Sequence, residues 1–285
     1  MNKKLIDIFH SFNFDFQVFI FRKRILLVFL FFVVLFFTYL EGGNVVTFAI
    51  NEKVTANAWD VVFSTLGSGN MLFLVLTPVF LLFISDIPVT THFDEFVLPR
   101  LNSRSKWLWS KIIVLIVSTF LYLATVLVII IATTSFGLPL NDKWSEMALN
   151  YPRYSYLSPQ IPKTFSVISA FLRLIVLLIL GWLGIGITVL VSSLFLNNAT
   201  FGFLIGTFID LGGYFSYHGY IPQCFVNFFV SNHMILSLHS FGENNPIYPQ
   251  YSLSIIYWIV WIFIFTVIGF FICRKKDFLL GKVTS

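Results

Sequence analysis

Asp210 is the residue whose type and position point most clearly to chemistry, because it is a carboxylic acid inside a long apolar stretch. It lies nine residues after Phe201, where a segment apolar enough to cross a membrane begins, and nine residues of helix rise about 14 Å. A carboxylate at such a depth is costly unless it is paired or faces a cavity, so Asp210 is a candidate polar residue of a translocation path. Gly212 and Gly213 follow at once and can loosen the helix, which leaves a structural hydrogen bond as the alternative interpretation.

Sequence motifs for hydrolysis are incomplete. Gly281 and Lys282 lack both the first glycine and the following Ser or Thr of a GxxxxGK[ST] phosphate-binding loop, so we do not expect this chain to hydrolyse ATP. The run Gly67-Ser68-Gly69 is typical of a serine nucleophile at a flexible helix start, but such a serine needs a histidine on another span. Three histidines lie instead in the outer segment, namely His218, His233 and His239. We therefore interpret the run as a flexible helix start.

Metal-binding patterns are also missing from the sequence. Cys224 and Cys273 lie 49 residues apart and belong to no CxxC or Cys/His pattern, which argues against a zinc module and a disulfide scaffold. No HExxH motif and no acidic pair suited to a catalytic metal occurs. We expect no catalytic residue, no metal ligand and no cofactor in this chain.

The composition places these residues in a membrane protein. Of the 285 residues, 58% are hydrophobic and 11% are charged, whereas an ordinary soluble domain has about 25% charged residues. The net charge of +5 is concentrated in a few Lys and Arg clusters, which membrane insertion explains better than nucleic-acid binding does. We expect a single all-α polytopic membrane domain over residues 1–285, in contact with lipid and without a nucleic-acid partner.

Six segments are long and apolar enough to span a bilayer as helices. Pro78 interrupts the second segment and is expected to kink it, and Gly181, Gly184 and Gly186 in the fourth are expected to allow close helix packing. The segments are Ile25–Leu40, Ser64–Asp86, Ile112–Phe136, Leu174–Leu196, Phe201–Tyr220 and Leu253–Cys273. Counted over the loops, 13 of the 18 Lys and Arg residues fall on the side of the two termini, which predicts that both termini are cytoplasmic.

Two further segments are expected to contact the membrane without crossing it. Residues 1–24 place apolar and polar side chains on opposite arcs of a helix, which predicts an N-terminal interfacial helix. Phe12, Phe14 and Phe16 also alternate as in a strand, but an unpaired strand at a membrane would leave backbone groups unsatisfied. Residues 221–250 are too apolar for a hydrated loop and contain several prolines, so we expect re-entrant helices on the outer side.

The cytoplasmic loop at residues 87–110 contains its own helix signal. Thr91 stands three residues before Asp94, which is the spacing of a capping box, and Pro99 disfavours helix geometry at Leu98. The short helix between them carries apolar side chains, which a receiving groove explains, beside acidic ones that anionic lipid would repel. Its residues are Phe93, Asp94, Glu95, Phe96, Val97 and Leu98.

This layout resembles the membrane permease subunits of ABC-2 type transporters over the whole chain. One local similarity is the run Phe93-Asp94-Glu95-Phe96 followed by Arg100, Ser103, Arg104, Trp107 and Lys111, which looks like the acidic-then-Ser-Arg-aromatic-Lys run of that family. The other is the run Phe271-Ile272-Cys273-Arg274-Lys275-Lys276-Asp277-Phe278, which is similar to the basic cluster that closes many members.

The resemblance implies a function and several partners. A separate cytoplasmic ATP-binding cassette ATPase, carrying ATP and Mg²⁺, would dock on the coupling helix at residues 93–98, and a second permease chain would complete the path. Similar permeases serve the export of, or immunity to, bacteriocins and amphipathic peptides in Gram-positive bacteria. We therefore expect a transporter subunit for an apolar or amphipathic cargo in a bacterial cytoplasmic membrane. The alternatives are an intramembrane enzyme acting on lipid or peptide, and a non-transporting membrane sensor or assembly partner.

Overall fold

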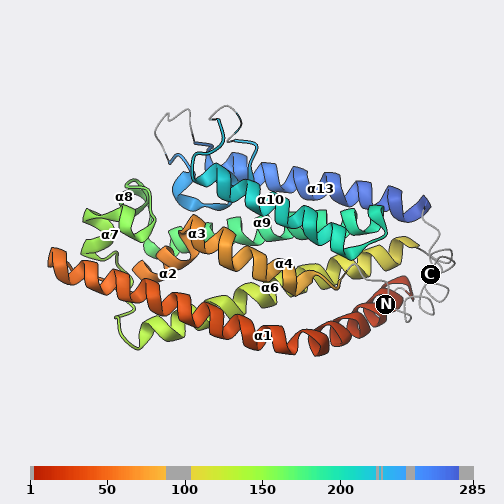
Figure 1. Ribbon diagram of the computed structural model, residues 1–285, viewed down its shortest axis with the longest axis horizontal. Helices are drawn as coiled ribbons and strands as arrows, with labels where there is room; N and C mark the ends of the chain where they lie inside the picture. The colour runs from red at the N-terminus through yellow and green to blue at the C-terminus, as the bar shows by residue number, and fades with distance from the viewer. Residues whose placement is uncertain (1–2, 88–103, 223–224, 226, 242–247, 276–285) are drawn as a thin grey trace.

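Long helices lying side by side along one axis make up most of the described chain (Figure 1). The computed structural model describes residues 3–87, 104–222, 225, 227–241 and 248–275. The longest elements are α1 (Lys3–Glu52), α6 (Arg104–Ser135), α9 (Val167–Leu196), α10 (Ala199–Tyr217) and α13 (Tyr251–Lys275). A second set is formed by α2 (Ala58–Gly67), α3 (Gly69–Met71), the π-helix η1 (Leu72–Leu76) and α4 (Thr77–Ile84). The described residues form one isolated β-bridge, between Ser240 and Gln250.

Short helices connect the long ones at one end of the bundle. They are α7 (Glu146–Asn150), the 3₁₀-helix η2 (Pro152–Ser155), α8 (Ile161–Thr164), α12 (Val230–Met234) and the 3₁₀-helix η3 (Leu236–Leu238). The predicted coupling helix falls on residues 88–103, which lie outside the described residues.

Four helices are long and apolar enough to cross a membrane: residues 25–52 of α1, then α6, α9 and α13. The pair formed by α2 and residues 69–84 is a fifth candidate if a bend of 56° within one span is accepted. The chain is therefore a multi-pass membrane protein. The prediction of six spans is not confirmed, because the structure supports four or five.

The missing sixth candidate is α10, which forms where the fifth span was expected. It has 19 residues, about 28 Å at the helical rise, which is long enough for a span. Its mean hydropathy is too low for it to be a candidate membrane span. Asp210 and the glycines on its buried face account for this, because they replace large apolar side chains. α10 nevertheless lies alongside α9 in the bundle and also packs on α4 and α12 (Figure 1).

Helix α1 is continuous where a separate interfacial helix was predicted. It runs for 50 residues, about 75 Å at the helical rise, with no break between residues 24 and 25. No glycine or proline occurs before Gly42, so nothing in the sequence ends the helix where the apolar span begins. The candidate span covers residues 25–52 of α1, so it continues past Leu40, where the predicted span ended.

The second predicted span bends at Ser68, not at Pro78. Ser68 has an extended backbone (φ −70°, ψ 124°), and its side chain accepts a hydrogen bond from the Met71 N–H at 3.5 Å. Pro78 lies in the first turn of α4, directly after η1, where the N–H of Thr77 bonds to the Leu72 oxygen five residues back. Proline has no backbone N–H to donate to the preceding turn. The wider π-turn accommodates this missing hydrogen bond, and the helix does not kink at Pro78.

Glycines of α9 allow the close helix packing that the sequence predicted. A Cβ added at Gly184 would lie 2.6 Å from the Trp258 ring of α13. One added at Gly186 would lie 2.8 Å from Leu115 of α6. Without a hydrophobic driving force between helices in lipid, such close approaches let van der Waals contact hold the bundle together.

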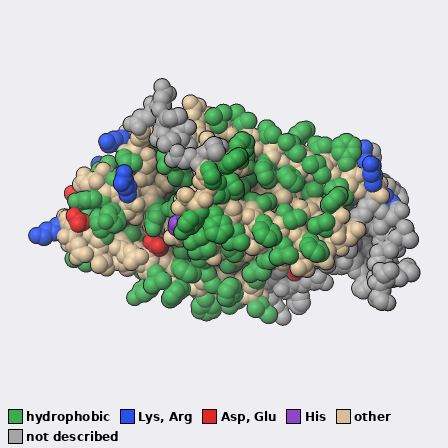
Figure 2. All heavy atoms as spheres, turned by 45° about the horizontal axis from the view of Figure 1, so that its top comes forward, with side chains coloured by type: hydrophobic (Ala, Val, Ile, Leu, Met, Phe, Trp, Pro, Cys, Tyr) green, Lys and Arg blue, Asp and Glu red, His purple; other side chains and the backbone are tan. Residues whose placement is uncertain are grey.

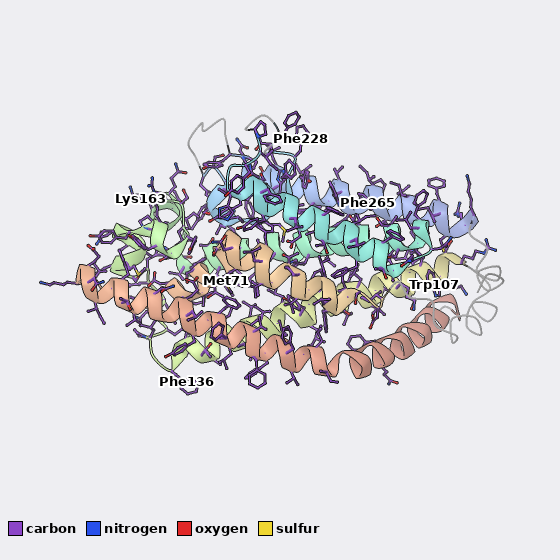
Figure 3. All side chains as sticks on the ribbon, viewed as in Figure 1. Met71, Trp107, Phe136, Lys163, Phe228 and Phe265 are labelled. Carbon is purple, nitrogen blue, oxygen red and sulfur yellow. The ribbon has the colours of Figure 1, made fainter. Side chains whose placement is uncertain are left out.

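Charged side chains gather at the two ends of the bundle, and apolar ones cover the middle (Figure 2). We name the end where α1 and α6 begin and α13 finishes the terminal end, and the end that carries α7 and α8 the cap end. Trp107 lies at the terminal end and Lys163 at the cap end (Figure 3). The described N-terminal and C-terminal helix ends therefore lie at the same end of the bundle, and the cytoplasmic location of this end stays a prediction.

The cap end is organised around the buried carboxylate of Asp60. Its Oδ1 accepts hydrogen bonds from the hydroxyls of Ser145 and Ser155, both at 2.9 Å, and its Oδ2 accepts one from the Asn57 N–H at 2.8 Å. The Asn57 side chain in turn accepts from the Asp60 N–H, which completes a capping box at the start of α2. One acidic residue thus ties α2 to α7 and η2.

We expect Asp60→Asn to loosen the cap end. The amide oxygen can still accept hydrogen bonds from the two serines. The amide nitrogen then faces the Asn57 N–H with a donor, so this buried N–H loses its acceptor, which lowers the free energy of unfolding by about 1–3 kcal/mol. The measurement is the unfolding midpoint in detergent, with the exposed Asp142→Asn as the matched control. Equal midpoints for the two variants would contradict the role of Asp60.

Candidate functional site

The first turns of α6 and the last turns of α13 meet at the terminal end. The guanidinium Nη1 of Arg104 donates a hydrogen bond to the Arg274 backbone oxygen at 2.9 Å, across 170 residues of sequence. The thiol of Cys273 donates to the Arg104 oxygen at 3.3 Å. One turn deeper, the rings of Trp109 and Phe270 lie 5.4 Å apart. The start of α6 and the end of α13 therefore form one joined surface, which we call the α6/α13 junction.

Asp210 lies inside the bundle on the glycine face of α10. The residues of α10 that are buried are Gly202, Gly206, Asp210, Gly213 and Ser216, which follow the helical spacing of a single face. A Cβ added at Gly206 would lie 2.5 Å from Val189 of α9 and 2.9 Å from Leu81 of α4. The face of α10 that carries Asp210 is thus pressed between α9 and α4, and Asp210 is only 1% exposed.

A short chain of polar groups reaches Asp210 from α4 and α9. The side chain of Thr77 is hydrogen-bonded to Asp210, and the Thr77 hydroxyl accepts a hydrogen bond from the Trp182 Nε1–H at 3.1 Å. Since that hydroxyl accepts from Trp182, its own hydrogen is free to point at the carboxyl group. The second oxygen, Oδ1, is buried and has no hydrogen-bond partner among the described residues.

The backbone next to Thr77 is irregular in a way that suits a functional position. The π-helix η1 ends at Leu76, whose backbone oxygen accepts a hydrogen bond from the Tyr122 hydroxyl at 2.6 Å. The Tyr122 ring lies 5.1 Å from that of Trp182 and 5.3 Å from that of Phe80. Such π-turns inside helices occur frequently at functional sites. We name Asp210, Thr77, Trp182 and Tyr122 the inner polar cluster.

The inner polar cluster can accept one more donor. No described cation forms an ion pair with Asp210, and the unpartnered Oδ1 can take a hydrogen bond or face a positive charge. Groups of three or more His, Cys, Asp and Glu side chains that could hold a metal ion are not found among the described residues. The site is therefore suited to a proton, an amine or a hydroxyl group, and its buried surroundings make an unshared negative charge costly.

The sequence did not reveal which side chains surround each predicted site residue. Thr77 and Trp182 lie on other helices, and no spacing links them to Asp210. His218, at the end of α10, contacts Asn70 Oδ1 at 2.8 Å, while Ser68 caps α3, so the run Gly67-Ser68-Gly69 is a helix break as interpreted. A second buried polar cluster, made of His233, His239 and Ser254, was missed, because its members come from three separate elements.

A family model described as a protein of unknown function, DUF2705, matches residues 25–279 of the chain. Neither the curated proteins nor the solved structures contain a match. Because the matched region includes all the candidate spans, the chain belongs to the DUF2705 family.

Proposed function

We propose that this member of the DUF2705 family is the permease subunit of an ABC-type exporter that works with a separate ATPase chain. The observation that carries the proposal is the α6/α13 junction. Residues 93–111 and 271–278 resemble the permease family at two distant places in the sequence. Among their described residues, Arg104 contacts Arg274 and Cys273. A partner that docks at the terminal end would touch both stretches at once.

The orientation of the proposed transporter follows from the same end of the bundle. With the terminal end in the cytoplasm, most Lys and Arg residues lie inside, and the loop between α4 and α6 faces the ATPase. Residues 93–98 are the proposed docking helix. In this orientation, the cap end and the segment around α12 lie on the outer side of a bacterial cytoplasmic membrane.

The proposed translocation path runs along α10, which serves as the sixth span. Its buried face carries Asp210 and is covered by α9 and α4, whereas its exposed face carries Phe201, Phe208 and Phe215. Pairing with a second permease chain would cover this exposed apolar face. A path lined mainly by apolar side chains, with one carboxyl group, suits an apolar or amphipathic cargo such as a membrane-active peptide.

Packing of the outer segment is consistent with the expected re-entrant helices. Met234 of α12 fills the space at Gly181, 14 residues into α9, which is about 21 Å along that helix. The intramembrane enzyme is the weaker alternative, because Ser68 is only 1% exposed and Ser254 is fully buried. A nucleophile needs access to its substrate.

Purification of the chain from its native membrane tests the proposal. We expect an ATPase subunit to co-purify and Mg²⁺-dependent ATP hydrolysis to appear only when both chains are reconstituted together, with cargo moved in the same samples. Turnover of lipid or peptide by the purified chain without ATP would instead support the enzyme. Isolation of the chain with neither an ATPase nor transport would leave the sensor as the better description.

A further inference from the structure

A buried hydroxyl joins two histidines beside α12. Ser254 of α13 lies 2.8 Å from the Nδ1 atom of His233 and 2.8 Å from the Nε2 atom of His239, measured at its Oγ atom. Ser254 is completely buried, His239 is 1% exposed and His233 is 5% exposed. These three residues form what we call the outer histidine cluster.

Each ring also contacts a backbone oxygen through its other nitrogen. The Nε2 atom of His233 lies 2.8 Å from the Asn227 oxygen, and the Nδ1 atom of His239 lies 2.9 Å from the Ile235 oxygen. A carbonyl oxygen can only accept a hydrogen bond, so both of these ring nitrogens must carry hydrogen. In a neutral imidazole the remaining nitrogen is then a bare acceptor.

The four contacts need one hydrogen more than the neutral groups can supply. Two neutral rings provide one hydrogen each, and both are used on the carbonyl oxygens. The Ser254 hydroxyl has one hydrogen for two ring nitrogens that face it. With both rings neutral, one of the two contacts to Oγ therefore places a bare ring nitrogen against an oxygen that has no hydrogen to donate. One added proton supplies the hydrogen for this contact.

We propose that the outer histidine cluster is a binding site for a single proton, held by one ring and bonded to the other through Ser254. The added proton makes one ring a donor to Oγ, while the hydroxyl donates to the second ring. All four contacts then have a hydrogen. The inference does not depend on the proposed transport function.

The surroundings of the cluster contain few charges. The Tyr257 ring of α13 stacks on His233 at 3.9 Å, and the Tyr251 ring lies 6.0 Å from that of His239. From α9, Arg173 faces the cluster only through Tyr251, since its guanidinium lies 5.0 Å from that ring. On α10, which also packs on α12, Tyr214 and Tyr217 contact the ring of His218, and Asp210 bonds to Thr77. No carboxylate among the described residues is bonded to either ring.

The acidic range is where the proton binds. Burial lowers the pKa of His239 from 6.5 to about 4, against the opposing effect of the Ile235 carbonyl, and it also lowers the pKa of His233. A charge on His233 lowers the pKa of His239 further, so a second proton is disfavoured. Because burial makes the folded pKa lower than the unfolded value, the protein's stability is complete above pH 6.5 and falls as the pH drops toward 4, while the hydrogen missing from the neutral pair opposes this decrease.

Proton binding acts on the position of the outer segment. The cluster ties α12 and the residues after η3 to α13, and the Trp258 Nε1–H adds a bond to the His233 oxygen at 2.9 Å. A change in the bonds of Ser254 is thus transmitted to a segment that packs against α9 and α10.

Nuclear magnetic resonance of the full chain in lipid nanodiscs, labelled with ¹³C and ¹⁵N in its five histidines, tests the proposal. Replacement of each histidine by Gln assigns the signals. Between pH 6.5 and 4 we expect the signals of His233 and His239 to change together in one step that amounts to one proton. Independent full titration of both rings in this range, or two rings that stay neutral down to pH 4, would overturn the site.

Two variants distinguish a proton that His233 and His239 share through Ser254 from two histidines that are merely buried. Ser254→Ala removes the shared oxygen, so the two rings should no longer change in one step. In His239→Gln, the amide N–H can donate the missing hydrogen to Ser254 Oγ. His233 then needs no added proton, so the midpoint of its titration should fall by about one pH unit or more. Wild-type behaviour of both variants would contradict the proposal, and the wild-type titration decides the matter if a variant does not fold.

Discussion

Replacement of Phe93 and Phe96 together by alanine is expected to abolish transport-coupled ATP hydrolysis. Both phenylalanines belong to the predicted coupling helix, which is enclosed between the cap at Thr91 and Pro99. Large apolar side chains on a short cytoplasmic helix gain from a groove that receives them, and the fully buried centre of such an interface carries most of the binding energy. The measurements are ATPase activity in the reconstituted complex and the yield of co-purified ATPase.

The matched control removes the same side chain at the other end of the bundle. Phe136, which follows α6 at the cap end, is 93% exposed, so Phe136→Ala should leave both quantities unchanged. Membrane insertion should be the same for all variants. Normal ATPase stimulation and complex yield in the Phe93/Phe96 double variant would show that this helix is not the docking element.

The α6/α13 junction explains how docking would reach the rest of the molecule. The proposed docking helix leads into α6 at Arg104, and α6 continues for 32 residues to the cap end. Because Arg104 is bonded to the last turn of α13, a displacement of the docking helix acts on two spans at once. The opposite end of α13 begins beside the outer histidine cluster. Helix α13 thus extends from the terminal end to the outer segment.

The spans with the strongest apolar pattern were predictable. Three predicted segments, Ile112–Phe136, Leu174–Leu196 and Leu253–Cys273, nearly coincide with or fall inside α6, α9 and α13, because hydrocarbon requires a long apolar helix. The helices begin earlier than predicted, since polar residues such as Arg104 and the capping Ser166 extend them beyond the apolar belt.

Features that depend on contacts between distant residues could not be predicted. Nothing in the sequence links Asp60 to Ser145 and Ser155, which lie 85 and 95 residues away. The bend at Ser68 depends on local backbone geometry, which competes with the better-known effect of Pro78. Asp210 was found because an intramembrane carboxylate is unusual in itself, whereas the partner Thr77 is an ordinary residue in an apolar helix.

Asp210→Asn is expected to lower cargo transport by about tenfold to a hundredfold, as loss of a charge-assisted hydrogen bond of about 1.5–3 kcal/mol would. Asparagine has the same size and keeps an acceptor for Thr77, so the packing of α10 against α4 and α9 should be retained. What it loses is the ability to take up or release a proton, or to face a positive group on the cargo, at the position of Oδ1. Transport in proteoliposomes is to be compared with protein yield and with ATPase co-purification.

Thr77→Val is the companion variant, because it disturbs the inner polar cluster without touching the carboxyl group. It leaves the Trp182 Nε1–H without its acceptor, so we expect a loss of stability of about 1–3 kcal/mol rather than a selective loss of transport. A selective transport defect in Asp210→Asn, with normal yield and ATPase binding, would support a place on the path. A parallel fall of all three quantities would mean that Asp210 serves the packing of α10, and unchanged transport would remove it from the path.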